Sequence, residues 1–220
     1  MRSLQRNPWP QNPDGSKKTP ADYKTFLPDL IDNFGQCCCY CEKAESSLDV
    51  EHVAPKSLNP TKICDWDNLL LACPKCNRDY KKSWNPDRTG YAWPDEKDTF
   101  DIFEYHIDGS MTVKDSLSSD EKECAQKTID LLGLNEPNSC SNWLCYKRYQ
   151  QWDIASIFLK DYENGAKTAE RIEFIVKNVV ANGYWSVWMT VFKDHPEVTQ
   201  KIADAFPGTL PKYCTPPANP

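Results

Sequence analysis

The sequence predicts an α+β protein in which a small unit of two strands and a helix precedes a mostly α-helical region. Three observations predict this class. Two C-x2-C pairs occur before residue 80, short strand-like runs accompany them, and the apolar pattern becomes helical after residue 118. We therefore divide the 220 residues into an N-terminal extension with a short helix (1–35), a central unit with a metal site (36–95) and a mainly helical C-terminal region (96–220).

The N-terminal extension begins with residues rich in Pro, Asn and Lys, which predict an extended lead-in over 1–20. The segment 21–34 predicts one or two short helices, broken at Pro28 and ended at Gly35.

The central unit shows two strand-like runs followed by a helix start. Residues 48–53 alternate between apolar and polar side chains, and Pro55 stops the run. Residues 66–73 are more apolar and predict a second, buried strand. Residues 76–83 predict the beginning of a short helix, which completes a ββα arrangement.

The C-terminal region begins with a predicted hairpin, because Asp108-Gly109 separates two short alternating runs. Ser118 and Glu121 fit a capping box, and Gly133 fits the end of that helix. Further helices are predicted over 141–162, 167–181 and 196–205, followed by a loose end at 213–220.

Composition argues against a membrane-spanning or disordered chain. Hydrophobic residues make up 40% and charged residues 26%, and no apolar run reaches the roughly 18–20 residues that a bilayer span requires. The first residues contain no apolar stretch, which predicts the absence of a secretory signal and a cytoplasmic location. In such a chain, eleven cysteines favour metal binding over disulfides.

The net charge of −6 argues against a tight, free-standing nucleic-acid binder. Residues 95–140 hold twelve Asp/Glu and four Lys, a net of −8, so the other residues net +2. This acidic segment either faces a basic partner or keeps the protein soluble. Residues 75–88 hold five Lys/Arg and two Asp, a net of +3, and form either a phosphate-contacting cluster or a solvated helix face.

The two C-x2-C pairs, Cys38/Cys41 and Cys73/Cys76, predict a four-sulfur zinc site. Each pair can offer two thiolates from one tight turn, and thiolate is a ligand that suits zinc. Cys37 or Cys39 could replace Cys38 as the partner of Cys41, and all of these cysteines could instead be reduced core residues. A zinc with four protein ligands would be structural, so chemistry would need another site.

The residues between and after these pairs resemble the HNH endonuclease family, of the zinc-knuckle type with a ββα-metal fold. The resemblance implies that His52 is the general base that deprotonates a water attacking a phosphodiester. It implies that Glu51 and Asn77 hold one catalytic Mg²⁺ (or Mn²⁺), and that Asn68 orients the loop or the imidazole. The motifs that carry it are Leu48-Asp49-Val50-Glu51-His52-Val53-Ala54-Pro55-Lys56, Trp66-Asp67-Asn68 and Cys73-Pro74-Lys75-Cys76-Asn77.

This chain departs from the family pattern at two positions, and each residue also has a plain structural interpretation. Glu51 stands where Asp is commoner, and Asn77 stands where the family often has His. His52 could be an ordinary surface or core histidine, Asn68 a turn cap and Asn77 a helix N-cap. The candidate phosphate contacts are Lys56, Arg78, Lys81 and Lys82, whereas His106 and His195 are expected to be structural or exposed.

Segments outside the unit resemble the PtuB-type HNH proteins of Septu and retron-associated anti-phage systems. The resemblance implies a regulatory partner, an ABC/SMC-like ATPase of the PtuA type, and a nucleic-acid substrate that is DNA or an RNA such as tRNA. A non-catalytic zinc module and a stand-alone restriction-type nuclease are the alternatives. The segments are Met1-Arg2, Phe100 to Gly109 and Thr128-Ile129-Asp130-Leu131-Leu132-Gly133-Leu134-Asn135, while Trp143, Trp152, Trp185 and Trp188 could be core or interface anchors.

Overall fold

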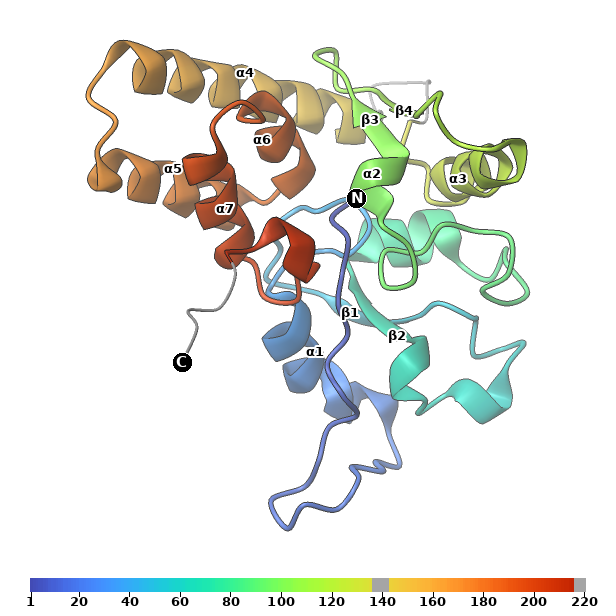
Figure 1. Ribbon diagram of the computed structural model, residues 1–220. Coiled ribbons are helices and arrows are strands. Elements are labelled where there is room, and N and C mark those ends of the chain that lie inside the picture. Colours follow the sequence, from blue (N-terminus) through green and yellow to red (C-terminus); the bar gives the residue numbers. More distant parts are fainter. Residues whose placement is uncertain (136–142, 216–220) are drawn as a thin grey trace.

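The computed structural model describes residues 1–135 and 143–215, so part of the predicted loose end and the first two residues of the predicted helix 141–162 lie outside the described residues. It confirms the α+β class (Figure 1). The helices are α1 (Leu27–Phe34), α2 (Thr99–Ile102), α3 (Ser119–Leu131), α4 (Trp143–Asn164), α5 (Ala169–Asn182), α6 (Trp185–Val191) and α7 (Pro196–Asp204), and the strands are β1 (Asp49–His52), β2 (Leu69–Ala72), β3 (Phe103–Tyr105) and β4 (Met111–Val113).

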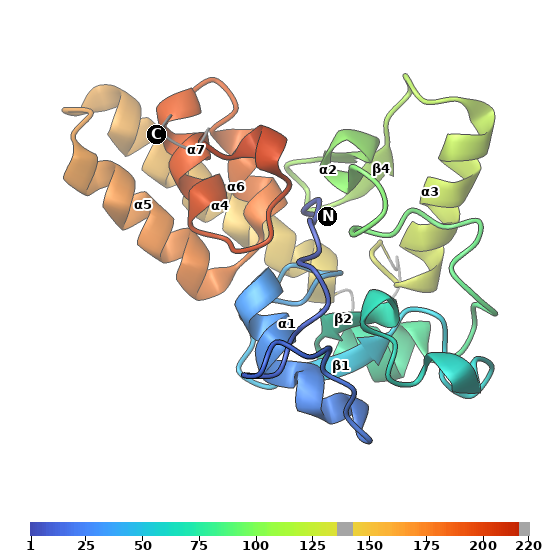
Figure 2. The same cartoon turned by 60° about the horizontal axis from the view of Figure 1, so that its bottom comes forward.

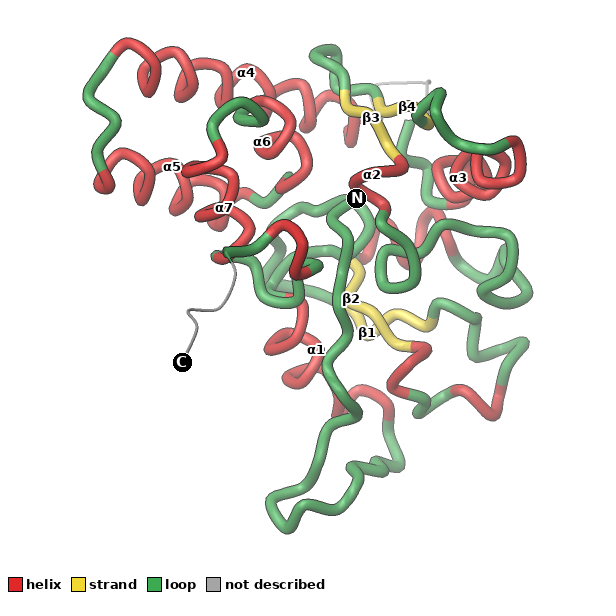
Figure 3. Tube along the Cα trace, viewed as in Figure 1, coloured by secondary structure: helices red, strands yellow, loops and turns green. Residues whose placement is uncertain are grey.

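The elements gather in three groups, which Figures 1 and 2 show from two directions. Helices α4–α7 lie together on one side, α3 with the β3–β4 hairpin lies on the other, and β1, β2 and α1 form the third group. The strands are short, and loops carry much of the chain between them (Figure 3). In the described residues, no helix is both long and apolar enough to cross a membrane.

The predicted ββα unit is present. Strands β1 and β2 pair antiparallel, with His52 opposite Leu69, and every residue of β2 is buried. A π-helix at Lys75–Lys81 follows β2, and the amide of Lys82 donates to the Asn77 carbonyl at 2.9 Å in the wide i→i+5 pattern. Lys82 ends this helix in a left-handed conformation with φ of 49°. Such wide turns occur frequently at functional sites.

The N-terminal extension differs from the prediction in two ways. Two short helical segments are present, a 3₁₀ turn at Tyr23–Phe26 and α1, but the break lies before Pro28, which occupies the first turn of α1, where no intrahelical N–H bond is lost. The first residues are also not a peripheral lead-in, since Met1 and Leu4 are buried and Leu4 bridges Thr209 near the other end of the chain. Gly35 ends α1 with φ of 77°, as expected.

The C-terminal region contains two helices that the sequence did not predict, namely the short α2, which occupies part of the first run of the predicted hairpin, and α6. Ser118 and Glu121 form the predicted capping box of α3, and α4, α5 and α7 lie where helices were expected. Helix α6 was missed because its sequence, WSVWMTV, is only seven residues long, which is too short to establish a helical period. Its two tryptophans, Trp185 and Trp188, are fully buried and belong to the core.

Two apolar clusters form the core. One cluster contains side chains from the N-terminal extension, the four strands, the two C-x2-C pairs and α3. The other contains side chains mainly from α4–α7. The turn after Cys41 connects the two regions: Glu42 accepts hydrogen bonds at its carboxylate from the Ser186 amide (3.0 Å) and hydroxyl (2.5 Å). The backbone carbonyl of Glu42 also accepts from the Tyr184 amide at 2.8 Å.

Candidate active site and metal centre

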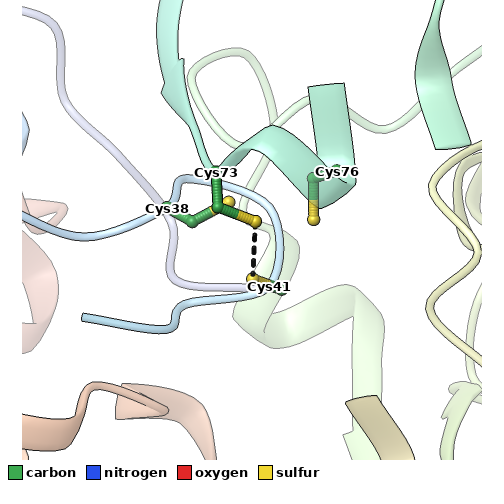
Figure 4. A group of neighbouring side chains, drawn as sticks. All are labelled: Cys38, Cys41, Cys73 and Cys76. Carbon is green, nitrogen blue, oxygen red and sulfur yellow. Dashed lines mark hydrogen bonds between the residues drawn. The ribbon is translucent and has the colours of Figure 1, made fainter. Parts of the chain in front are cut away.

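Four buried cysteines form a cluster that fits a zinc ion. The sulfurs of Cys38, Cys41, Cys73 and Cys76 lie within 4.8 Å of one another, and the Cys41 and Cys73 sulfurs are 3.8 Å apart (Figure 4). Four ligands at about 2.3 Å from a tetrahedral zinc are separated by about 3.8 Å. Hydrogen bonds among the sulfurs lower the pKa of the Cys73 thiol far below its usual value and raise the pKa of the Cys41 and Cys76 thiols, so the four sulfurs together stabilise one thiolate.

The structure also decides which of the three consecutive cysteines joins the site. Cys38 lies in the cluster, whereas the Cys37 sulfur donates to the Glu42 carbonyl at 2.9 Å. The Cys39 amide donates to the Leu71 carbonyl, and burial raises the pKa of its thiol to about 12. Cys37 and Cys39 are therefore buried thiols outside the cluster. Their bonds fix the Cys38–Cys41 segment, at Cys39 to β2 and at Cys37 to the turn that follows Cys41.

His52 lies at the end of β1 with 7% of its surface exposed. Its Nε2 is 2.9 Å from the Ile63 carbonyl, and because a carbonyl only accepts, Nε2 must carry the hydrogen. Burial lowers the pKa of His52, which outweighs the opposing effect of that hydrogen bond. The neutral ring therefore keeps its lone pair on Nδ1, where no described residue forms a hydrogen bond with it.

Glu51 is buried and held at one oxygen. Its Oε1 is 2.6 Å from the Lys81 ammonium and 3.4 Å from the Tyr40 hydroxyl. Burial raises the pKa of the Glu51 carboxyl, although Lys81 and Tyr40 act in the opposite direction. Among the described residues no group donates to Oε2, so that oxygen is available to a cation.

Lys81 was predicted to contact phosphate, and this prediction is wrong. Its side chain is fully buried, because the ammonium binds the Glu51 carboxylate and donates to the His52 carbonyl at 2.9 Å. A nucleic-acid phosphate therefore has no access to it, and its role is to hold Glu51 and the end of β1. Arg78 is exposed, but its guanidinium is paired with Asp49 at 2.8 and 3.0 Å.

The two asparagines have different roles. Asn68 is buried and holds the loop after β1, since its Oδ1 accepts from the Ala54 amide (2.7 Å) and its Nδ2 donates to the Ala54 carbonyl (2.9 Å). Asn77 lies inside the π-helix and not at its N-cap. Its Nδ2 donates to Asp49 at 3.1 Å, which leaves Oδ1 as a hard oxygen ligand.

One cavity of about 300 Å³ brings most of these groups together. It contains the predicted base, both predicted cation ligands and two of the predicted phosphate contacts. Tyr23 also lines it, which sequence reasoning missed because Tyr23 lies in the extension and no motif links it to the unit. The lining residues are Tyr23, Val50, Glu51, His52, Pro55, Lys56, Ser57, Asn77, Lys82 and Ser83.

The donor set of this cavity fits a magnesium ion better than a zinc ion. Glu51 Oε2 and Asn77 Oδ1 are hard oxygen donors, the kind through which Mg²⁺ binds while it keeps several waters. In the parts of the chain that are described, the cysteine cluster is the one group of three or more His, Cys, Asp or Glu residues that could hold a metal. A cation in the cavity would therefore complete its shell with water and substrate phosphate.

Comparison with known proteins confirms the expected resemblance. Residues 37–83 match the sequence model of the HNH endonuclease family, so the chain carries an HNH endonuclease domain. The chain is 31% identical over 111 residues to a retron Vc95 protein named as an HNH endonuclease, from Vibrio cholerae serotype O1 biovar El Tor, covering 47% of this chain and 54% of that protein. It is 35% identical over 52 residues to the Septu protein PtuB of Bacillus thuringiensis, covering 22% of this chain and 20% of that protein. The chain thus spans about half the length of one relative and a fifth of the other.

Proposed function

We propose, from the HNH endonuclease domain at residues 37–83, that the protein is a metal-dependent endonuclease that hydrolyses nucleic-acid phosphodiester bonds in anti-phage defence. The observation that carries this proposal is one cavity lined by His52, Glu51 and Asn77, with the His52 Nε2 bonded to the Ile63 carbonyl so that Nδ1 is the basic ring nitrogen. A base and two hard cation ligands in one small cavity are what metal-assisted hydrolysis requires.

In the proposed reaction, Nδ1 of His52 takes a proton from a water molecule while the water oxygen attacks phosphorus. One P–O bond forms, and the bond to the leaving oxygen breaks, after which that oxygen takes up a proton from solvent. Glu51 and Asn77 would hold a Mg²⁺ ion, which neutralises the charge that develops on the phosphate. The Ile63 carbonyl keeps the base in its Nδ1-active tautomer throughout.

The zinc centre has a structural part in this proposal. Its four cysteines fill a tetrahedral shell, so no position remains for a reacting water. The site joins the first knuckle to the start of the π-helix that carries Asn77. Because a thiolate site needs reduced cysteines, the proposal keeps the cytoplasmic location expected from the sequence.

The decisive experiment is the substitution His52→Ala in the purified full chain, assayed on DNA and on tRNA. We expect cleavage to fall by at least about 100-fold, because a positioned base contributes on this scale. The matched control is His106→Ala, which removes a histidine bonded to Thr112 in the β3–β4 hairpin and should leave cleavage unchanged.

Metal dependence is tested with the same preparations. EDTA should stop cleavage, Mg²⁺ or Mn²⁺ should restore it, and His52→Ala should retain wild-type zinc content and melting temperature. Wild-type cleavage by His52→Ala, or cleavage that EDTA does not affect, would overturn the mechanism. A chain that binds zinc and nucleic acid but never cleaves would be a non-catalytic zinc module.

We also propose that an ABC/SMC-like ATPase of the PtuA type binds and regulates this protein. Similarity to the Septu protein PtuB supports the proposal. So does a set of exposed apolar side chains on α4 and α5, a kind of surface that favours protein contacts: Tyr146, Ile154, Ile157 and Phe174. Co-expression with such an ATPase should give a stable complex that Ile157→Glu weakens, and cleavage without any ATPase effect would favour a stand-alone nuclease.

A further inference from the structure

Tyr23 contacts two groups of the proposed active site, although it lies outside the residues that match the family. Its ring packs against the His52 imidazole, with ring centroids 4.6 Å apart and ring planes at 72°. Its hydroxyl accepts a hydrogen bond from the Lys56 ammonium at 2.8 Å. The same ammonium lies 4.4 Å from the centroid of the Tyr23 ring. All three side chains line the cavity that contains the cation ligands.

The turn that carries Tyr23 is fixed to the core. Tyr23 begins a 3₁₀ turn that ends at Phe26, and the Asp22 side chain caps this turn by accepting from the Lys24 amide at 2.9 Å. Phe26 is fully buried and packs against Trp66, with ring centroids 5.5 Å apart. The tyrosine is therefore presented from a well-anchored element and not from a free loop.

We propose that Tyr23 is a positioning residue for the nuclease reaction: its ring fixes the His52 imidazole, and its hydroxyl fixes the Lys56 ammonium at the same cavity. The inference rests on the proposed function. It extends the active site beyond residues 37–83 and assigns a role to the N-terminal extension.

The His52 ring needs a second restraint because one hydrogen bond does not define its plane. The bond from Nε2 to the Ile63 carbonyl sets the tautomer, but the ring can still rotate about that contact. An aromatic neighbour packed against the imidazole limits this rotation and so directs the Nδ1 lone pair. A base must be held within about 10–20° of its productive orientation, so loss of the restraint lowers the rate of the chemical step.

Lys56 needs a restraint for a different reason. Its side chain is exposed and carries the ammonium on a flexible four-carbon chain, so an unpaired ammonium would sample many positions. The tyrosine hydroxyl occupies one N–H of the ammonium, and the ring face attracts its charge. The two remaining N–H groups are left to donate to a substrate phosphate, so loss of the hydroxyl weakens substrate binding more than chemistry.

Two substitutions separate these effects when kcat and KM are measured on the full chain with Mg²⁺. Tyr23→Phe keeps the ring, so we expect kcat within twofold of wild type and a KM raised about threefold to tenfold. Tyr23→Leu removes the ring, so we expect kcat to fall about tenfold to 100-fold, and Phe at this position to rescue it. The control Tyr91→Leu removes another partly buried tyrosine, packed on Trp93 and outside the cavity, and should leave kcat and KM unchanged.

A spectroscopic measurement tests the same proposal without turnover. Imidazole ¹⁵N spectra of the wild-type protein should show His52 as a single tautomer with the hydrogen on Nε2. In Tyr23→Leu, we expect the hydrogen to stay on Nε2, because the Ile63 carbonyl sets the tautomer, and the His52 signals to broaden because the ring samples several orientations. An unchanged signal together with wild-type kcat and KM in Tyr23→Leu would overturn the proposal.

The remaining outcomes are also decisive. If Tyr23→Leu does not fold, Tyr23→Phe is combined with Lys56→Met: the two substitutions should raise KM by the same factor and the pair no further, and independent effects would refute the role of the hydroxyl. If His52→Ala abolishes cleavage while both Tyr23 variants cleave normally, this inference fails and the proposed function stands. If no variant changes cleavage, the proposed function fails as well.

Discussion

The HNH domain at 37–83 and the helical region α4–α7 bury very different side chains. The domain buries Glu51, His52, Asn68 and Lys81, and each of them has a hydrogen-bonding or ionic partner. The helical region buries mainly apolar side chains and exposes others, such as Ile157 and Phe174. Burying ionisable groups costs stability unless they are paired. Among its described residues the helical region buries one charged side chain, Arg148, which donates to backbone carbonyls, whereas the HNH domain buries several close to one cavity, which marks where chemistry is concentrated.

The largest expected effect comes from removing a zinc ligand. In Cys73→Ser, the domain should lose zinc and unfold while α5–α7 keep their structure, because zinc sites of this size supply about 10 kcal/mol or more of apparent binding free energy. Hydrogen exchange measured by mass spectrometry should show lost protection over 37–83 and retained protection over 169–204. The control Cys64→Ser lies outside the cluster and should change neither region. Full protection of the domain in Cys73→Ser would contradict this difference between the regions.

The next effect concerns the buried ion pair. Lys81→Met should lower the free energy of unfolding by about 3–5 kcal/mol, because it leaves the Glu51 carboxylate buried and unpaired. The control is Lys177→Met on α5, whose pair with Glu173 at 2.7 Å is exposed and should contribute less than about 0.5 kcal/mol. Denaturant titrations of both variants measure these changes in the free energy of unfolding. Equal losses in Lys81→Met and Lys177→Met would contradict the expected difference between the two regions.

The pH dependence of Lys81→Met gives a second test of the same pair. The pKa of Glu51 is already raised by burial, and removal of the ammonium should raise it further. A raised pKa in the folded state means that stability is retained at low pH and lost as pH rises through that pKa. The deficit of Lys81→Met against wild type should therefore be smaller at pH 5 than at pH 8. A constant deficit would show that the carboxyl does not respond to the loss of Lys81.

The smallest expected effect is on the pH profile of cleavage. Burial lowers the pKa of His52 below its ordinary value near 6.5, so the base is unprotonated at pH 7. Cleavage with saturating Mg²⁺ should therefore be nearly flat from pH 7 to 8 and fall about tenfold per pH unit only well below pH 6.5. A steep rise between pH 7 and 8 would show that another group limits the rate.

The sequence was sufficient for those parts of the site whose spacing carries the chemistry. The zinc cysteines were predicted from the spacing of their two pairs, and they form one cluster. Glu51, His52 and Asn77 were predicted from the resemblance to the HNH endonuclease family, and all three line one cavity. Spacing favoured Cys38 over Cys37 and Cys39 as the partner of Cys41, and the geometry of the cluster agrees.

The remainder depends on contacts between distant residues. Lys81 and Lys82 are adjacent and alike in sequence. Only the wide winding of the π-helix and the positive φ of Lys82 separate them, so that the Lys81 ammonium is buried whereas Lys82 lines the cavity. The packing of Phe26 against Trp66 places Tyr23 beside His52. Phe26 precedes His52 by 26 positions in the chain, and no local sequence pattern encodes a contact over such a separation. Long-range packing of this kind is invisible to periodicity.

The turn at Glu42, directly after Cys41, is a contact that the HNH domain and the helical region share. Glu42 directly follows Cys41. Its carboxylate accepts hydrogen bonds from Ser186, and its carbonyl accepts one from the Tyr184 amide at the start of α6. It is also held in a left-handed conformation with φ of 64°, which a side chain of this size adopts only where its surroundings enforce it. A displacement of α6 would therefore move the turn that follows Cys41 first. It would reach the cavity through β2 and the π-helix, which are joined to that turn by the cysteine cluster.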